Sequence, residues 1–164
     1  MLIAGVYVCL GRPHRYDTRM RISFLTALLF VNFMSTTHAE PLQVGAAAPA
    51  INVTTDAGTQ MNLADVYKKG TTLVYFYPKA DTPGCTTQAC NLRDNLDQLN
   101  NAGVQVVGVS ADSVEAQAAF KQKYNLNFPL VADQKREVIG AFGVQGRQSF
   151  LVKDGKIAWR DLKA

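Results

Sequence analysis

The chain has 164 residues, of which 48% are hydrophobic and 18% are charged, as is typical of one small globular domain. Residues 1–39 hold four arginines and one aspartate, a charge of +3, whereas residues 40–164 hold 13 Lys or Arg and 12 Asp or Glu, a charge of +1. The nearly neutral larger part gives no indication of nucleic-acid binding, so we expect no nucleic-acid partner.

Residues 1–39 have the pattern of an upstream extension followed by a secretory signal. Arg19 and Arg21 precede an apolar stretch over residues 22–33, and small residues stand at the third and first positions before Glu40. The stretch is shorter than the roughly 20 residues that a membrane-spanning helix needs. We expect export, to the periplasm, without stable membrane association after cleavage; an uncleaved anchor or a core helix is the alternative.

Translation is then expected to start at Met20, with cleavage after Ala39. The expected mature chain, residues 40–164, contains two cysteines, Cys85 and Cys90, and no histidine. A Cys-His dyad and a zinc site with histidine ligands are therefore excluded from it.

Strand and helix patterns alternate along this mature chain. The apolar run 73–77 predicts a buried strand, and the next segment predicts a helix from Pro83 that stops before Gly103, with leucines at 92, 96 and 99 on one face. The other expected elements are a hairpin of 50–54 with 60–63, a strand over 104–110, a helix to 124 capped by Ser113, a short helix to 142 capped by Asp133, and a hairpin of 150–152 with 157–159.

This order predicts an α/β fold in one domain, residues 40–164. Because a long helix separates the strands 73–77 and 104–110, we expect these strands to be parallel neighbours joined by a right-handed crossover.

The junction between the first of these strands and its helix indicates a thiol-redox site. Pro78 ends the strand, Thr82 is the expected N-cap, and Pro83 suits the first helical position. Cys85 then falls in the first helical turn, where unpaired N–H groups and the helix dipole favour a thiolate over a thiol.

The residues of this junction also carry a resemblance to a known family. The run 78–85, Pro-Lys-Ala-Asp-Thr-Pro-Gly-Cys, matches the P-x-x-x-T-x-x-C motif of peroxiredoxins. The longer string 75–90 resembles the peroxiredoxin Q subfamily, also called bacterioferritin comigratory proteins, and the likeness runs from about residue 42 to 159. It implies a thioredoxin-like fold, a central mixed sheet flanked by helices, and reduction of hydrogen peroxide and organic hydroperoxides.

The chain departs from the family pattern at two places. The segment between Phe142 and Arg147 is shorter than usual, which we expect to leave the rim of the site more open. The final helix of the family is missing or short, which would leave one face of the sheet partly uncovered.

The resemblance implies a peroxidatic role for Cys85, whose thiolate would attack a peroxide and become a sulfenic acid. The Thr82 hydroxyl can serve both thiolate and peroxide while also capping the helix, and the Cys85 backbone N–H is a further expected donor. Pro78 would shield the site from water and stiffen the loop.

Arg147 is the expected cation of the site, since it resembles the family arginine that stands two residues before a Ser-Phe-Leu strand. An arginine at such a place is otherwise most often a solvated surface residue. Arg93, two helical turns beyond Cys85, is the rival, although we expect it to pair with Asp97 at i+4.

Cys90 is the expected resolving cysteine. Residues five apart in an α-helix have Cα atoms about 8–9 Å apart, whereas a disulfide spans less than about 7 Å. A Cys85–Cys90 disulfide therefore requires that the first turns of the helix unwind. In the reduced state, Cys90 would be a small core residue.

The expected partners are a hydroperoxide and a dithiol reductant, thioredoxin or another donor, with the protein itself a monomer. No nucleotide, flavin or metal motif occurs, so the cysteines themselves would serve as the redox group and no cofactor is expected.

Two other functions fit parts of the sequence. A secreted thioredoxin-like disulfide reductase is one, but such proteins have C-x-x-C and a cis-proline where Gln148 stands. A Cu(I)-binding thiol protein is the other, but it lacks a third ligand near Cys85 and Cys90.

Overall fold

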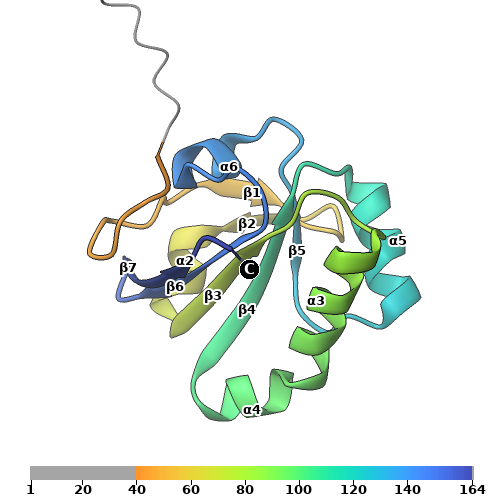
Figure 1. The fold of residues 1–164 in the computed structure, drawn as a ribbon, viewed down its shortest axis with the longest axis horizontal. Helices are drawn as coiled ribbons and strands as arrows, with labels where there is room; N and C mark the ends of the chain where they lie inside the picture. Colours follow the sequence, from red (N-terminus) through yellow and green to blue (C-terminus); the bar gives the residue numbers. More distant parts are fainter. Residues whose placement is uncertain (1–39, 164) are drawn as a thin grey trace, which may run out of the picture. The chain divides into compact units, whose positions relative to one another are not determined.

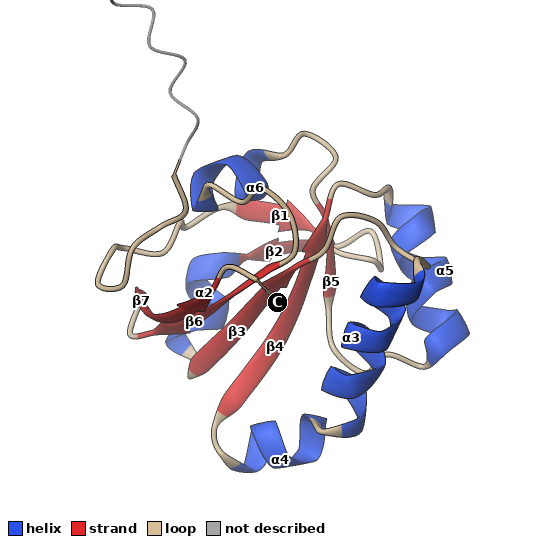
Figure 2. Ribbon diagram, viewed as in Figure 1, coloured by secondary structure: helices blue, strands red, loops and turns tan. Residues whose placement is uncertain are grey.

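Residues 40–163 are described by a computed structural model, and the expected signal segment, residues 1–39, lies outside them. The described chain forms a five-stranded sheet with helices on both faces and a small two-stranded sheet beside it (Figure 1, Figure 2). In chain order the elements are β1 Asn52–Thr54, β2 Gln60–Asn62, α2 Leu63–Lys68, β3 Thr71–Phe76, α3 Pro83–Asp94, α4 Leu96–Asn101, β4 Val104–Ser110, α5 Val114–Tyr124, β5 Leu130–Ala132, α6 Glu137–Phe142, β6 Gln148–Lys153 and β7 Lys156–Asp161.

The larger sheet is mixed and has the strand order β5-β4-β3-β6-β7. The strand β3 runs parallel to β4, with Val74 opposite Val107, and antiparallel to β6, with Val74 opposite Phe150. The parallel pairing across the α3–α4 crossover and the α/β class with a mixed central sheet are therefore confirmed.

The alternation of side chains along β3 builds a core on each face of the sheet. Val74 and Phe76 point into one core, and Tyr75 and Tyr77 point into the other, because successive strand residues face opposite sides. The first core lies under α2, α6 and the small sheet, and the second lies under α3, α4 and α5 (Figure 2). Cys85 belongs to the second core.

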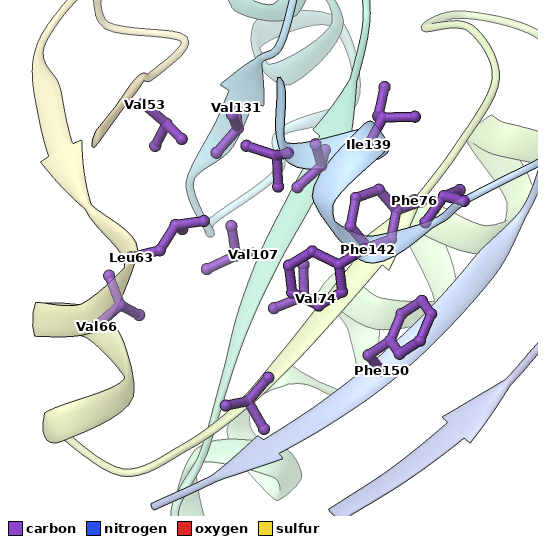
Figure 3. Packing of buried hydrophobic residues seen from close by; sticks show 14 of the residues in the cluster. Val53, Leu63, Val66, Val74, Phe76, Val107, Val131, Ile139, Phe142 and Phe150 are labelled. Atoms are coloured by element: carbon purple, nitrogen blue, oxygen red, sulfur yellow. The ribbon is translucent and has the colours of Figure 1, made fainter. Parts of the chain in front are cut away.

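Three phenylalanines form the centre of the first core (Figure 3). The rings of Phe76 and Phe142 are 5.1 Å apart, and those of Phe142 and Phe150 are 5.2 Å apart. Phe142 is fully buried at the end of α6, so its ring joins this helix to β3 and β6.

The helix predicted from Pro83 to residue 102 is wrong in one respect, because it is broken at Asn95 into α3 and α4. Asn95 has φ −104° and ψ 8°, outside the helical region, and its side-chain amide donates to the Asn91 carbonyl at 2.8 Å. Asparagine competes for backbone hydrogen bonds in this way, which shortens helices. The leucines at 92, 96 and 99 still pack on the second core.

Two elements were not predicted from the sequence, α2 and β5. The helix α2 has only six residues and begins at Asn62, whose side chain accepts from the Ala64 N–H at 2.8 Å. The strand β5 has three residues, and it is a strand because Leu130 pairs with Gly108 of β4.

The caps expected for the helices after Ser113 and Asp133 are confirmed, the second with one change. Ser113 accepts from the Ala116 N–H at 3.2 Å at the start of α5. Asp133 accepts from the N–H groups of Glu137 and Ile139, although Arg136 occupies the N-cap position of α6.

The last two strands form a longer hairpin than expected, around Asp154 and Gly155, which have φ 51° and 71° as a two-residue turn requires. No helix follows β7 up to residue 163, and Trp159 on this strand is 50% exposed. In the same part of the chain, no helix is long and apolar enough to span a membrane.

Replacement of Phe142 by alanine should lower the free energy of unfolding by about 3–5 kcal/mol, since it empties a fully buried aromatic site. Trp159→Ala is the control and should cost less than about 1 kcal/mol, because the indole is half exposed. Urea unfolding of both variants measures the difference, and equal losses would contradict the position of Phe142 in the core.

Candidate active site

The site is built where β3 leaves the sheet and α3 begins. The Tyr77 N–H still donates to the Val109 carbonyl at 3.1 Å, so the sheet holds the chain up to Pro78. Asp81 then takes a left-handed conformation with φ 59°, and Thr82 is extended at the N-cap position with φ −92° and ψ 150°. As predicted, α3 begins at Pro83, which places Cys85 in its first turn.

The Cys85 thiol is buried, with a residue exposure of 1%, and an arginine contacts it. The Arg147 Nη2 atom donates to the Cys85 Sγ atom at 3.5 Å. Burial by itself raises the pKa of Cys85, but hydrogen bonds from Thr82, Arg147 and the Lys79 backbone, together with the charge of Arg147, lower the pKa below its ordinary value. The net effect favours a thiolate in a position that water reaches poorly.

Thr82 lies beside this thiol but does not cap α3 with its side chain. Its carbonyl accepts the Thr86 N–H at 2.8 Å, while its hydroxyl donates to the Lys79 carbonyl at 3.0 Å. The expected side-chain cap is thus wrong, because the Lys79 oxygen takes the hydroxyl proton. A hydroxyl has one proton, which can go to this oxygen or, after rotation, to a Cys85 thiolate.

A glycine leaves the room that Arg147 occupies. A Cβ atom at Gly84 would lie 2.6 Å from the Arg147 Nη2 atom, so a side chain there would require the guanidinium to move. The residue before Cys85 therefore favours the contact between the two elements that carry the site, α3 and the chain just before β6.

Pro78 is exposed at the rim of the site. It lines a depression of about 190 Å³ together with Phe76, Ile139, Val144 and Gly146. The segment after α6 forms one side of this depression, whose lining does not include Cys85, Thr82 or Arg147.

Cys90 is partly buried and lies on the same unbroken helix as Cys85, and both thiols are free. The two Cα atoms of an intact α-helix at this spacing are about 8–9 Å apart. The described conformation is therefore that of the reduced protein, and the helix must open before the two sulfur atoms can bond.

Arg93 does not pair with Asp97 as predicted. It binds Asp94, with 2.8 Å between Arg93 Nη2 and Asp94 Oδ1, and its other terminal nitrogen donates to the Tyr124 carbonyl of α5. The break at Asn95 removes the i+4 relation on which the prediction relied. Arg93 thus connects α3 to α5, and the structure brings Arg147 to the thiol instead.

Sequence reasoning missed the backbone of Lys79 and the closeness of Gly84 to Arg147. Backbone groups have no sequence signal of their own, whereas the glycine directly before the cysteine could have been noticed. Among residues 40–163, no group of three His, Cys, Asp or Glu side chains could hold a metal ion.

Arg147→Ala should raise the pKa of Cys85 and slow its reaction with hydrogen peroxide at neutral pH by about tenfold or more, since a charged donor to the sulfur is lost. The pH profile of thiol alkylation should move to higher pH, because the thiolate forms only at higher pH. Arg160→Ala is the control, since Arg160 binds the carbonyls of Pro41 and Leu42. Unchanged values for Arg147→Ala would make it a surface residue only.

Comparison with known proteins agrees with this geometry. Residues 44–160 match the AhpC/TSA family. Peroxiredoxin Bcp of Escherichia coli strain K12 is 49% identical over 113 residues, which are 69% of this chain and 72% of that protein.

The structure of this chain is also similar to solved structures of peroxiredoxins. The peroxidoxin BcpB of Mycobacterium tuberculosis superposes with a TM-score of 0.71 at 29% identity, over 73% of this chain and 85% of that one. A peroxiredoxin Q of Xanthomonas campestris superposes with a TM-score of 0.69 at 31% identity, over 75% and 87% of the two chains. The fold is therefore that of the thioredoxin-like peroxiredoxins, and the chain belongs to the AhpC/TSA family and, within it, to the Bcp and Q group of thiol-dependent peroxidases.

Proposed function

We propose that this protein reduces hydroperoxides at Cys85, forms an intramolecular Cys85–Cys90 disulfide, and is recycled by thioredoxin or another dithiol donor. The observation that carries the proposal is the contact of a buried thiol in the first turn of α3 with the Arg147 guanidinium, at 3.5 Å. The second cysteine on the same helix supplies the resolving thiol.

In the first step the Cys85 thiolate attacks the distal oxygen of the hydroperoxide. A sulfur–oxygen bond forms, the oxygen–oxygen bond breaks, and the leaving oxygen takes a proton to become water or an alcohol, leaving a sulfenic acid on Cys85. Negative charge moves from sulfur to the two oxygens, so donors must already point there. Arg147 and the Thr82 hydroxyl lie where they can donate to these atoms.

In the second step the Cys90 thiol attacks the Cys85 sulfenic acid. A disulfide forms and the sulfenic oxygen leaves as water. This step requires that α3 unwinds, because the separation in the intact helix exceeds what a disulfide spans. In the third step a dithiol donor is oxidised, and both cysteines return to thiols.

One of the related proteins supports organic as well as inorganic substrates for this chain. The bacterioferritin comigratory protein of Xanthomonas campestris, 30% identical with a TM-score of 0.69, was studied for its alkyl peroxide reduction activity. We include alkyl hydroperoxides among the substrates of this chain on this ground.

Export to the periplasm is part of the proposal. Its support is the charged, apolar and small-residue pattern of residues 19–39, together with a family match that begins only at residue 44. In that compartment the reductant would be a dithiol donor that is itself exported.

Cys85→Ser should abolish peroxide consumption, by about 1,000-fold or more, because the attacking sulfur is lost. Cys90→Ser should react with the first equivalent of hydrogen peroxide within about threefold of the native rate, and then stop at the sulfenic acid and overoxidise more readily. Stopped-flow oxidation with mass spectrometry of the products measures both variants. Activity of Cys85→Ser near that of the native protein would exclude the peroxidase assignment.

The oxidised native protein provides the control for the resolving step. Mild peroxide should produce the Cys85–Cys90 disulfide and speed amide exchange from about residue 83 to 92, since the helix must open to bring the sulfurs together. Cys90→Ser should keep its protection after oxidation. A disulfide within an undisturbed helix would contradict the proposed mechanism.

Export predicts an N-terminus at or near Glu40 for the protein isolated from its native host. Mass spectrometry of the purified protein and fractionation of the cells measure it. A full-length chain confined to the cytoplasm would contradict the export proposal and leave the chemistry at Cys85 untouched.

A further inference from the structure

A series of hydrogen bonds, part-buried at Asp112 and buried at Gln117, connects the loop before Thr82 to the end of β4. Asp112 lies two residues after the end of β4, and its Oδ2 atom accepts the Ala80 N–H at 2.7 Å and the Ser110 hydroxyl at 2.7 Å. The Ala80 N–H belongs to the peptide that joins it to Lys79. One carboxylate oxygen from the bend after β4 thus fixes a peptide of the active-site loop.

That peptide is fixed at its other end by the active site itself. The Lys79 carbonyl accepts the Thr82 hydroxyl at 3.0 Å, and the Thr82 side chain is one of the groups that lower the pKa of Cys85. In a trans peptide the N–H and C=O groups point in opposite directions. The orientation that gives the N–H to Asp112 is therefore the one that turns the carbonyl toward Thr82.

The carboxylate is in turn held by groups in the second core. The Gln117 Nε2 atom donates to the Ser110 Oγ atom at 2.7 Å and to the Val131 carbonyl at 3.0 Å, and Tyr77 donates its hydroxyl to Gln117. Ser110 and Gln117 are both fully buried. Hydrogen bonds that are shielded from water are stronger and allow less movement than exposed ones. This network therefore holds the Asp112 side chain in one position.

We propose that Asp112 is a positioning residue of the peroxidatic site, which orients the Lys79–Ala80 peptide so that the Lys79 carbonyl holds the Thr82 hydroxyl beside Cys85. It touches neither the sulfur nor the substrate and acts through the peptide alone. The proposal rests on the peroxidase function proposed above and adds a residue that lies just after β4, outside the motif of residues 78–85.

The geometry gives a conservative variant that keeps the proposed role. Both donors to the Asp112 side chain bind the same oxygen, Oδ2. An asparagine with its carbonyl oxygen in that place can accept both bonds, whereas an alanine can accept neither. Asp112→Asn should therefore retain the role that Asp112→Ala loses.

Asp112→Ala should raise the pKa of Cys85 and lower its second-order rate constant with hydrogen peroxide by about tenfold or more, as misplaced active-site groups do. Asp112→Asn should stay within about threefold of the native rate constant. Stopped-flow oxidation and pH-dependent alkylation measure the two quantities. A residue that only stabilises the fold would leave both unchanged in protein that remains folded.

Asp56→Ala is the matched control. Its carboxylate also accepts a backbone N–H, that of Leu130 at 2.8 Å, but it lies next to the small sheet. It should lower the free energy of unfolding while leaving the Cys85 pKa and rate constant within about twofold of native, since no group of the site depends on it.

Native values for a folded Asp112→Ala, or equal losses in Asp112→Asn and Asp112→Ala, would overturn the proposal. If Asp112→Ala does not fold, Ser110→Ala replaces it, because it removes one of the two donors to Oδ2 and should give a smaller loss of the same kind. Native values for Ser110→Ala would then overturn it. Native protein inert to peroxide would contradict the peroxidase function alone, because the Cys85 pKa still tests Asp112.

Discussion

The Cys85 sulfur must carry a negative charge at a position that is almost fully buried, and the surrounding structure depends on this constraint. Burial favours the neutral thiol, so each neighbour that favours the thiolate has to offset it. The described chain has no histidine to do so. Instead, the first turn of α3 supplies its dipole, and Arg147 supplies a positive charge next to the sulfur.

The same helix has a second, opposite requirement. Cys85 needs α3 intact to be a thiolate, and Cys90 needs it open to form a disulfide. Contacts at both ends of α3 limit the part of the chain that has to move. Asp81 before it binds Lys123, with 2.7 Å between Asp81 Oδ2 and Lys123 Nζ, and Arg93 near its end binds the Tyr124 carbonyl. Both anchors lie at the C-terminal end of α5 (Figure 1), so the chain between them can open while its ends stay in place.

The sequence allowed the junction of β3 with α3 to be predicted because its signals are local. The spacing of three residue types carries these signals. A proline marks the end of the strand, a threonine marks the start of the helix, and the cysteine that follows lies in the first helical turn. The pairing of β3 with β4 followed from their length and apolar character. The three-residue strand β5 could not be predicted in this way, because its identity depends on a partner more than 20 residues away.

The residues of the site likewise divide into those that local sequence signals indicate and those that depend on contacts with distant residues. The contact of Arg147 with Cys85 came from family resemblance, since position alone would have assigned the arginine to the surface. The wrong pairing of Arg93 with Asp97 came from assuming a continuous helix, which the side chain of Asn95 interrupts. The hydrogen bond from the Ala80 N–H to Asp112 joins residues 32 positions apart. Because nearly every residue has a backbone N–H, no sequence pattern indicates which of them forms such a bond.

The elements that hold the site differ in how much they have to move during the reaction. Arg147, which binds the Cys85 sulfur, lies just before β6. Asp112, which lies just after β4, binds the loop of residues 78–81 through the Ala80 N–H. Neither of these supports belongs to α3. When α3 opens, the charged donor and the loop can keep their positions, because both depend on the central sheet. Closing then requires only that one helical segment refold against a surface that is already formed, which is a local event with few residues to order.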